Sequence, residues 1–462
     1  MQQEQPTRPV QSTQSTQPRL PAAVPYIIGN EAAERFSFYG MKAVLMVYMT
    51  NVLLMSDPEA AGWGHLFAGS ICLFPIAGAI LADMFLGKYR VIFWLSLVYC
   101  MGHAVLALPG SVFGGNLRLA LAIGLSLIAI GSGGIKSCVT SIVGDQFHEG
   151  NQTLLERVFG WFYLSINVGA FVSAIITPVL FHHYGHEVAF AIPGILMGIA
   201  TLILWLGRKK YVIVPPSKKS FFHELKSPEV RATLGKVFSV FLFLIPFWAV
   251  YEQCAYRWVG QAKEMNGKLF ETWAFLPDWL RNIEVLPSQM NAFNPFLILV
   301  LVPIFSYVIY PLMNRRGNLT IVRKMAIGFV TGCIAAVFPL VFEYCILSEI
   351  RLNLGWQFLA YFFLTAAEVM VSITSLEFAY TQAPRTMKAI VMSAYLLMTM
   401  IANFLCAGVN ALCNSYKGFL SGTGYYWFFF LLLVASSTLF FFVAARYREK
   451  TYLQETAVAE KE

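Results

Sequence analysis

Apolar runs long enough to cross a membrane recur about twelve times along the chain, separated by short polar stretches. A helix needs roughly 20 mostly apolar residues to cross a bilayer core of about 30 Å. The runs begin near Tyr26, Gly62, Val91, Leu117, Val158, Val188, Val237, Phe296, Met325, Trp356, Ala389 and Tyr425. This pattern predicts an all-α membrane protein with about twelve transmembrane helices.

The composition agrees with that prediction. Of the 462 residues, 57% are hydrophobic and 13% are charged, whereas about 25% of residues are charged in soluble domains. The eight cysteines fall mostly within apolar runs and lack metal-ligand spacing, so we expect neither a disulfide framework nor a metal site. We find no nucleophilic-serine motif, P-loop or HExxH motif, so we expect a protein that is not an enzyme and has no cofactor besides protons.

Lys and Arg are concentrated in alternate connections, and this bias places both termini in the cytoplasm. The basic segment 211–236 separates an N-terminal half, 26–210, from a C-terminal half, 237–448. We therefore expect two six-helix bundles of the kind that rock about a central cavity. Residues 1–25, which show no signal peptide and are expected to be disordered, and residues 449–462 are interpreted as cytoplasmic tails. The net charge of +8 follows from the loop bias, so no nucleic-acid partner is expected.

The first apolar run contains three charged residues, Glu31, Glu34 and Arg35. A single charge at the centre of such a helix costs on the order of 3 kcal/mol or more. Spacings of three and four residues place the three side chains on one helical face. Two acids beside a guanidinium neutralise each other, and the second acid can carry a proton. The pattern favours a proton relay, with a purely structural ion network as the alternative.

Three more polar positions interrupt later runs. Lys136 would balance the charges of the first run, unless its ammonium snorkels to the interface. Asn167 would bind either a ligand amide or a neighbouring helix. Glu377 would make the C-terminal side of the cavity acidic. Such a cavity suits a zwitterion whose amino end meets Glu377 and whose carboxylate meets Lys136 or Arg35.

The second run carries candidate residues at both ends. His65 has a side chain that titrates near ambient pH, so it would load protons from outside, although an interfacial histidine is more often an ordinary hydrogen-bonding residue. Asp83 closes the run before Gly87 and Lys88. It would cap or salt-bridge a neighbouring helix end and latch one conformation. This stretch is similar to the loop signature of the major facilitator superfamily.

Together these stretches resemble the proton-dependent oligopeptide transporter family. The matching segments are 29–40, 131–136 followed by 145–147, 162–169, and 376–384. The resemblance implies a major facilitator fold and uptake of di- and tripeptides driven by protons.

The resemblance also assigns residues by position. It implies a proton-coupling network of Glu31, Glu34, Arg35, His65 and Lys136. It implies a peptide site made of Arg35, Tyr39, Tyr48, Lys136, Asn167, Glu377 and Tyr395. Asp83 and Arg257 are expected to act in gating.

Several positions depart from the family pattern. Phe38 replaces a usual Tyr, Lys42 a usual Arg, and Cys72 a pocket Tyr, while Tyr395 stands where a pocket Trp is common. Ser288 stands where close relatives carry the acid that pairs with the seventh-helix arginine. These changes leave the ion network intact but bear on substrate preference and gating.

The missing acid leaves Glu252 or Glu284 as substitute partners for Arg257. Two alternatives to peptide–proton symport also stay open. One is the same fold with a non-peptide or modified-peptide cargo, and the other is a peptide sensor without transport. Short connections after the sixth and ninth runs favour a compact bacterial protein of the inner membrane. We expect it to work as a monomer.

Overall fold

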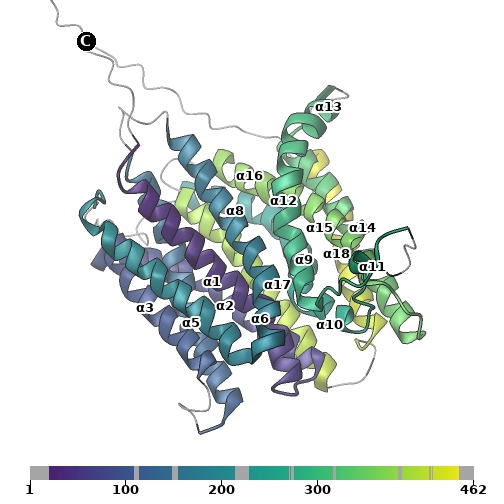
Figure 1. Cartoon of the computed structure of the whole chain (residues 1–462). Coiled ribbons are helices and arrows are strands. Elements are labelled where there is room, and N and C mark those ends of the chain that lie inside the picture. Colours follow the sequence, from purple (N-terminus) through teal and green to yellow (C-terminus); the bar gives the residue numbers. More distant parts are fainter. Residues whose placement is uncertain are drawn as a thin grey trace, which may run out of the picture.

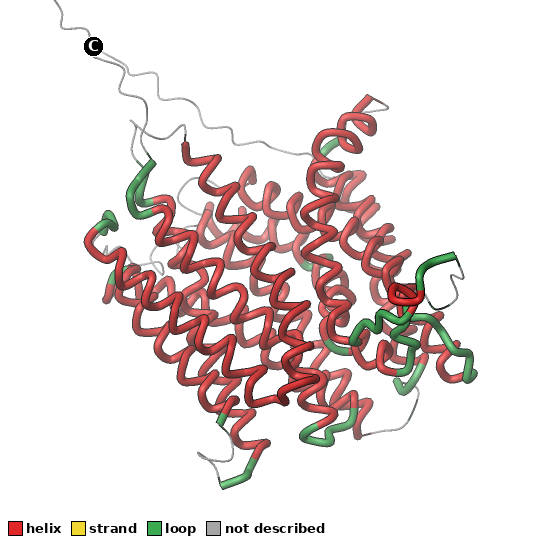
Figure 2. The backbone as a smooth tube through the Cα atoms, viewed as in Figure 1, coloured by secondary structure: helices red, strands yellow, loops and turns green. Residues whose placement is uncertain are grey.

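The computed structural model describes residues 20–108, 114–147, 154–213, 228–269, 271, 275–315, 319–382, 388–415, 418 and 420–446. Within these residues the fold is almost entirely helical, and short loops join the helices (Figure 2). Ten of the helices are long and apolar enough to cross a membrane. The predicted fold class, an all-α membrane protein, is confirmed.

The N-terminal half is built from long helices. They are α1 (Val24–Asn51), α2 (Asp57–Leu81) with the π-helical continuation η1 (Ala82–Leu86), α3 (Lys88–Ala107), α5 (Leu117–Gly144) and α6 (Leu155–Leu206), followed by the short η3 (Gly207–Lys209). Gly185, at φ 83° and ψ 179°, interrupts α6, so α6 forms two spans. A positive φ suits glycine because it has no Cβ to clash.

The C-terminal half combines three spans made of shorter helices placed end to end with three spans that are single long helices. Its seventh span comprises α8 (Pro228–Phe241), α9 (Leu244–Tyr251), η4 (Glu252–Ala255) and α10 (Arg257–Lys263). The eighth comprises η5 (Pro287–Ala292), α12 (Phe293–Ile304), η6 (Phe305–Ile309) and α13 (Tyr310–Arg315), and the short α11 (Asp278–Arg281) precedes it. The ninth is α14 (Ile321–Leu347). The tenth comprises η7 (Leu354–Trp356), α15 (Gln357–Glu368), η8 (Val369–Ile373) and α16 (Thr374–Gln382). The last two are α17 (Lys388–Ser415) and α18 (Thr423–Arg446).

The described residues supply the predicted twelve spans. The ten candidate helices leave out α1, which carries four charged residues, and count α6 once. Adding α1 and dividing α6 at Gly185 gives twelve. In Figure 1, α1, α2, α3 and α5 gather on one side of the molecule, and α12, α14 and α15 lie on the other.

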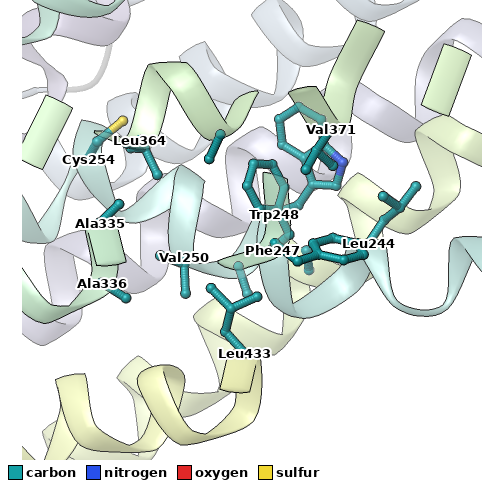
Figure 3. Close-up of a cluster of buried hydrophobic side chains, with 14 of the residues drawn as sticks. Leu244, Phe247, Trp248, Val250, Cys254, Ala335, Ala336, Leu364, Val371 and Leu433 are labelled. Carbon is teal, nitrogen blue, oxygen red and sulfur yellow. The ribbon is translucent and has the colours of Figure 1, made fainter. Parts of the chain in front are cut away.

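Each half has its own hydrophobic core. Tyr99 and Phe190 belong to the core of the N-terminal half. Phe247 and Trp248 belong to that of the C-terminal half, where they pack near Leu433 of α18 (Figure 3). The exact bundle boundaries stay a prediction. Residues 1–19, 214–227 and 447–462, which hold most of the expected tails and linker, lie outside the described residues.

Glycines let helices of the N-terminal half approach closely. A Cβ added at Gly78 of α2 would lie 2.0 Å from the carbonyl oxygen of Gly134 on α5. Small residues at such a crossing are typical of membrane helix packing. The α2–α5 contact therefore requires glycine at position 78.

The two halves are joined at the end of the molecule where α1 ends and α2 begins, which we call the joined end. Ser56 Oγ donates to Asn414 Oδ1 at 2.7 Å, and Lys263 Nζ contacts Thr50 Oγ1. These contacts tie α1 and the start of α2 to the ends of the seventh and eleventh spans.

Tyr256 is a large side chain of the C-terminal half that lies in the core of the N-terminal half. Its ring packs against the imidazole of His65 with centroids 4.8 Å apart. A Cβ at Gly64 would lie 2.3 Å from this ring. The close fit of Tyr256 at the joined end therefore depends on glycine at position 64.

Candidate functional site

A cavity of about 300 Å³ lies between the two halves. This volume is at the lower end of the range for small-molecule sites. Its polar lining includes Tyr39, Lys42, Tyr163, Asn167, Tyr251, Glu252, Asn291, Asn294, Tyr361, Glu368 and Ser372. Its apolar lining includes Ile166, Ala170, Ala174, Pro295, Ile298, Val369, Ile373 and Leu376. Charged groups and apolar surface thus face the same space.

An ion pair crosses the cavity between the halves. Lys42 of α1 donates through Nζ to Glu252 Oε2 of η4 at 3.2 Å. Their side chains are 20% and 12% exposed, so water screens the pair only partly. The structure therefore pairs Glu252 with Lys42 rather than with Arg257, for which Glu252 was one of the two partners considered.

A second acid of the cavity, Glu368, is held by neutral groups. Asn294 Nδ2 donates to Glu368 Oε2 at 2.7 Å and to Thr365 Oγ1 at 3.1 Å. Tyr251 donates its hydroxyl proton to Asn294 Oδ1 at 3.2 Å. Glu368 ends α15, and the π-helical η8 follows it directly. Such wide turns are frequent at functional sites.

The three charges of α1 form a compact buried cluster, which we call the Arg35 cluster. Arg35 Nε lies 3.0 Å from Glu31 Oε1 and 2.5 Å from Glu34 Oε2. Ser132 Oγ of α5 donates to Glu34 Oε1 at 3.2 Å. The three charged side chains are 2–7% exposed. With two carboxylates and one guanidinium, the cluster is electrically neutral only when it binds one proton.

Lys136 is exposed on α5, and within the described residues it makes no ion pair. The structure thus brings Glu31, Glu34 and Arg35 together without direct contact from Lys136. Neither the role of Lys136 in proton coupling nor the snorkelling alternative is tested by this exposure, and both stay predictions.

The residues predicted for the peptide site are placed differently. Tyr39 and Asn167 line the cavity. Tyr48 is fully buried against Phe190, with ring centroids 5.0 Å apart, and lies outside the lining. Tyr395 lies behind the lining, where its hydroxyl is 3.1 Å from Ser372 Oγ.

Glu377 lies outside the cavity lining. It is exposed on α16, and its Oε2 lies 3.7 Å from Lys324 Nζ. In this geometry Glu368, nine residues earlier, is the acid of the tenth span that faces the cavity. The sequence carried one signal for Glu368, because an acid inside an apolar run is energetically costly and such residues mostly mark functional sites.

The structure describes the side chains of two of the three residues assigned to proton entry and gating, namely His65 and Arg257. His65 is fully buried at the joined end, with Nδ1 3.1 Å from Asn403 Oδ1. The Arg257 guanidinium lies 4.2 Å from the centre of the Tyr425 ring, and Arg257 makes no ion pair within the part of the chain that the structure describes. The side chain of Asp83 lies outside the described part.

Twelve spans in two cores, with buried charge at a cavity between them, define a two-bundle membrane protein of the kind that moves solutes. The chain belongs to the POT family, whose sequence profile matches residues 89–228 and 222–426. The resemblance drawn from the sequence motifs is confirmed.

Similar proteins extend this result. Solute carrier family 15 member 2 of Mus musculus is 37% identical over 380 residues, which cover 72% of this chain and 49% of that protein. Peptide transporter family 1 of Drosophila melanogaster is 34% identical over 355 residues, which cover 68% and 46%. The chain spans about half the length of the curated relatives that it matches.

Solved structures share the fold along nearly the whole chain. The crystal structure of an auto-inhibited POT family peptide transporter is 32% identical and covers 94% of this chain and 99% of its own, with a TM-score of 0.84. The POT family transporter PepTSo is 30% identical and covers 93% and 98%, with a TM-score of 0.82. The major facilitator fold that the resemblance implied is therefore confirmed.

Proposed function

We propose that the chain is a proton-coupled symporter that takes up di- and tripeptides by alternating access. The observation that carries the proposal is the cavity between the halves, which contains the acid Glu368 and the cross-half pair of Lys42 and Glu252. A peptide zwitterion has an ammonium at one end and a carboxylate at the other. Relatives named as peptide transporters support this substrate class.

In this proposal the cavity binds a peptide at three places. Glu368 accepts the amino end, because its carboxylate is held by neutral donors rather than by a cation. Lys42 takes the carboxylate once its bond to Glu252 is broken. Ile298, Ile373 and Leu376 provide apolar surface for the side chains. The cavity of about 300 Å³ restricts the substrate to short peptides.

Protons enter this scheme through the acids. A proton on Glu252 removes its attraction for Lys42, and a proton on Glu31 or Glu34 neutralises the Arg35 cluster. Proton and peptide then favour the same state of the transporter, and each raises the affinity for the other. Loss of the proton restores the Lys42–Glu252 pair, which displaces the peptide carboxylate.

Positive loop charge supports an orientation with both termini in the cytoplasm. In that orientation the joined end faces outward. The Tyr256 contact and the Ser56–Asn414 hydrogen bond must then separate when the halves rock to admit substrate. We further propose that the protein works as a monomer in a bacterial inner membrane.

Uptake of labelled dialanine into proteoliposomes tests the function. We expect accumulation with an inward proton gradient, competition by other dipeptides, and little accumulation without the gradient. Nitrate serves as a control competitor and should have no effect. Folded protein, verified by a cooperative thermal transition, that shows no gradient-dependent uptake would contradict the proposal.

A further inference from the structure

Hydrogen bonds join three spans on one side of the cavity. Tyr251 at the end of α9 donates to Asn294 of α12 at 3.2 Å, and Asn294 donates to Glu368 at the end of α15 at 2.7 Å. All three side chains line the cavity. The seventh span is thus connected to the acid of the tenth through the eighth.

Tyr251 completes the set of hydrogen bonds that fixes the orientation of the Asn294 amide. An ionised carboxylate only accepts hydrogen bonds, so Glu368 requires the NH₂ group of the amide. The amide oxygen must then face Tyr251, whose hydroxyl supplies the matching proton. Without that hydroxyl the amide oxygen loses its donor, and Asn294 is held only through its NH₂ group, by Glu368 and Thr365.

The same segment leads to the cross-half ion pair. Glu252 directly follows Tyr251, at the junction where α9 ends and η4 begins. Glu252 accepts from Lys42 of α1 at 3.2 Å. Tyr251, which is connected to Glu368 through Asn294, is therefore adjacent in the chain to Glu252, which binds Lys42 of the N-terminal half.

We propose that Tyr251 is a positioning residue for substrate binding. Through Asn294 it holds the Glu368 carboxylate where the amino end of a peptide binds, and through the backbone it links that place to the Lys42–Glu252 pair. This inference rests on the proposed function. Tyr251 thereby connects the place where the peptide amine binds, Glu368, with the Lys42–Glu252 pair that must break during transport.

Tyr251→Phe removes only the hydroxyl, so dialanine uptake by the reconstituted protein tests the proposal. We expect the KM to rise about five-fold while the maximal rate changes by less than about two-fold, because one neutral hydrogen bond is lost. Tyr26→Phe is the matched control. The Tyr26 hydroxyl accepts from Lys210 Nζ at 2.8 Å at the start of α1, away from the cavity, and its loss should leave the KM unchanged.

A double-mutant cycle separates positioning from a general structural effect. In a Glu368→Gln background, Tyr251→Phe should add no further rise in KM. An equal rise in both backgrounds, or none in the wild-type background, overturns the proposal. If Tyr251→Phe lacks a cooperative thermal transition, Asn294→Ala replaces it in the same cycle and is judged by the same criterion.

Uptake by the wild-type protein distinguishes a failure of the proposed function from a failure of the role of Tyr251. Wild-type protein that fails to accumulate dialanine overturns the proposed function and the role of Tyr251 with it. Wild-type protein that accumulates dialanine, with an unchanged KM in the Tyr251→Phe variant, overturns the role of Tyr251 alone.

Discussion

The two groups of buried charge in this protein are built in opposite ways. The Arg35 cluster takes all its charges from five consecutive residues of α1. The Glu368 group takes its members from three spans, with Asn294 lying 43 residues after Tyr251 and 74 before Glu368. The first is an ion cluster fixed by one helix, and the second is a single acid held by two neutral side chains, an arrangement that exists only when three helices pack together.

This difference predicts different tolerance to change. The Arg35 cluster is almost fully buried, so losing its single cation leaves two carboxylates without compensation. Glu368 lines a cavity and is held by hydrogen bonds from an amide, so its loss should weaken binding without destabilising the fold. Variants in the two groups should therefore separate effects on folding from effects on affinity.

The largest effect is expected for Arg35→Leu. Breaking a buried ion pair by removing one partner costs about 3–5 kcal/mol. We expect uptake to be abolished and the thermal transition in detergent to fall markedly. Arg35→Lys keeps the positive charge and should recover part of the transition temperature. Wild-type stability of Arg35→Leu would show that both carboxylates take up a proton when the guanidinium is lost.

Glu368→Gln should leave the thermal transition nearly unchanged and raise the KM for dialanine. Loss of a charged hydrogen-bonding partner corresponds to roughly a ten- to hundred-fold weaker interaction. An amino-blocked dipeptide should be affected much less, because it lacks the ammonium that Glu368 binds.

Glu377→Gln is the matched control, because Glu377 lies in the same span outside the cavity lining. An ion pair with an exposed carboxylate, such as Glu377 with Lys324, contributes little, so the KM of the Glu377→Gln variant for dialanine should change by no more than about two-fold. A larger effect for Glu377 than for Glu368 would restore the assignment made from the sequence motif.

Glu252→Gln tests the connection between the halves. The Lys42–Glu252 pair is partly exposed, so its loss should lower uptake by about ten-fold rather than abolish it. The double exchange Lys42→Glu with Glu252→Lys restores opposite charges and should recover part of the rate. No recovery would mean that the position of each charge matters more than the pair.

The smallest effect is expected for Ser132→Ala, which removes one hydrogen bond to Glu34. Ser132 does not line the cavity, so the loss of this bond should reach the substrate only indirectly, and we expect about a three-fold change in uptake affinity. Ser126→Ala is the control, because the Ser126 hydroxyl donates to the Ala122 carbonyl of its own helix. Equal effects of the two variants would indicate a change in α5 rather than in the cluster.

The sequence predicts best those features that depend on neighbouring residues. The twelve spans follow from the length of the apolar runs, and the Arg35 cluster follows from helical spacing. The choice between Glu368 and Glu377 does not, because it depends on how α15, η8 and α16 rotate toward the cavity. The partner of Glu252 is likewise decided by the packing of α1 against η4.

Asn294 and Tyr251 show what sequence reasoning missed. Asn294 is a polar residue inside an apolar run, which is a signal of function in a membrane helix, yet nothing nearby in the sequence names its partners. Tyr251 precedes an acid in a run rich in aromatic residues, so its hydroxyl has no distinguishing pattern. A role for either residue becomes visible only from the hydrogen bonds that join the seventh, eighth and tenth spans.

The missing side chain at Gly64 has a practical consequence for studying the protein. Because the Tyr256 ring packs directly on that glycine, a single added methyl group would clash with the ring at the joined end. Alanine at this one position would then offer a chemically minimal way to hold the two bundles apart, which would provide a conformational trap for isolating the state opposite to the one described here.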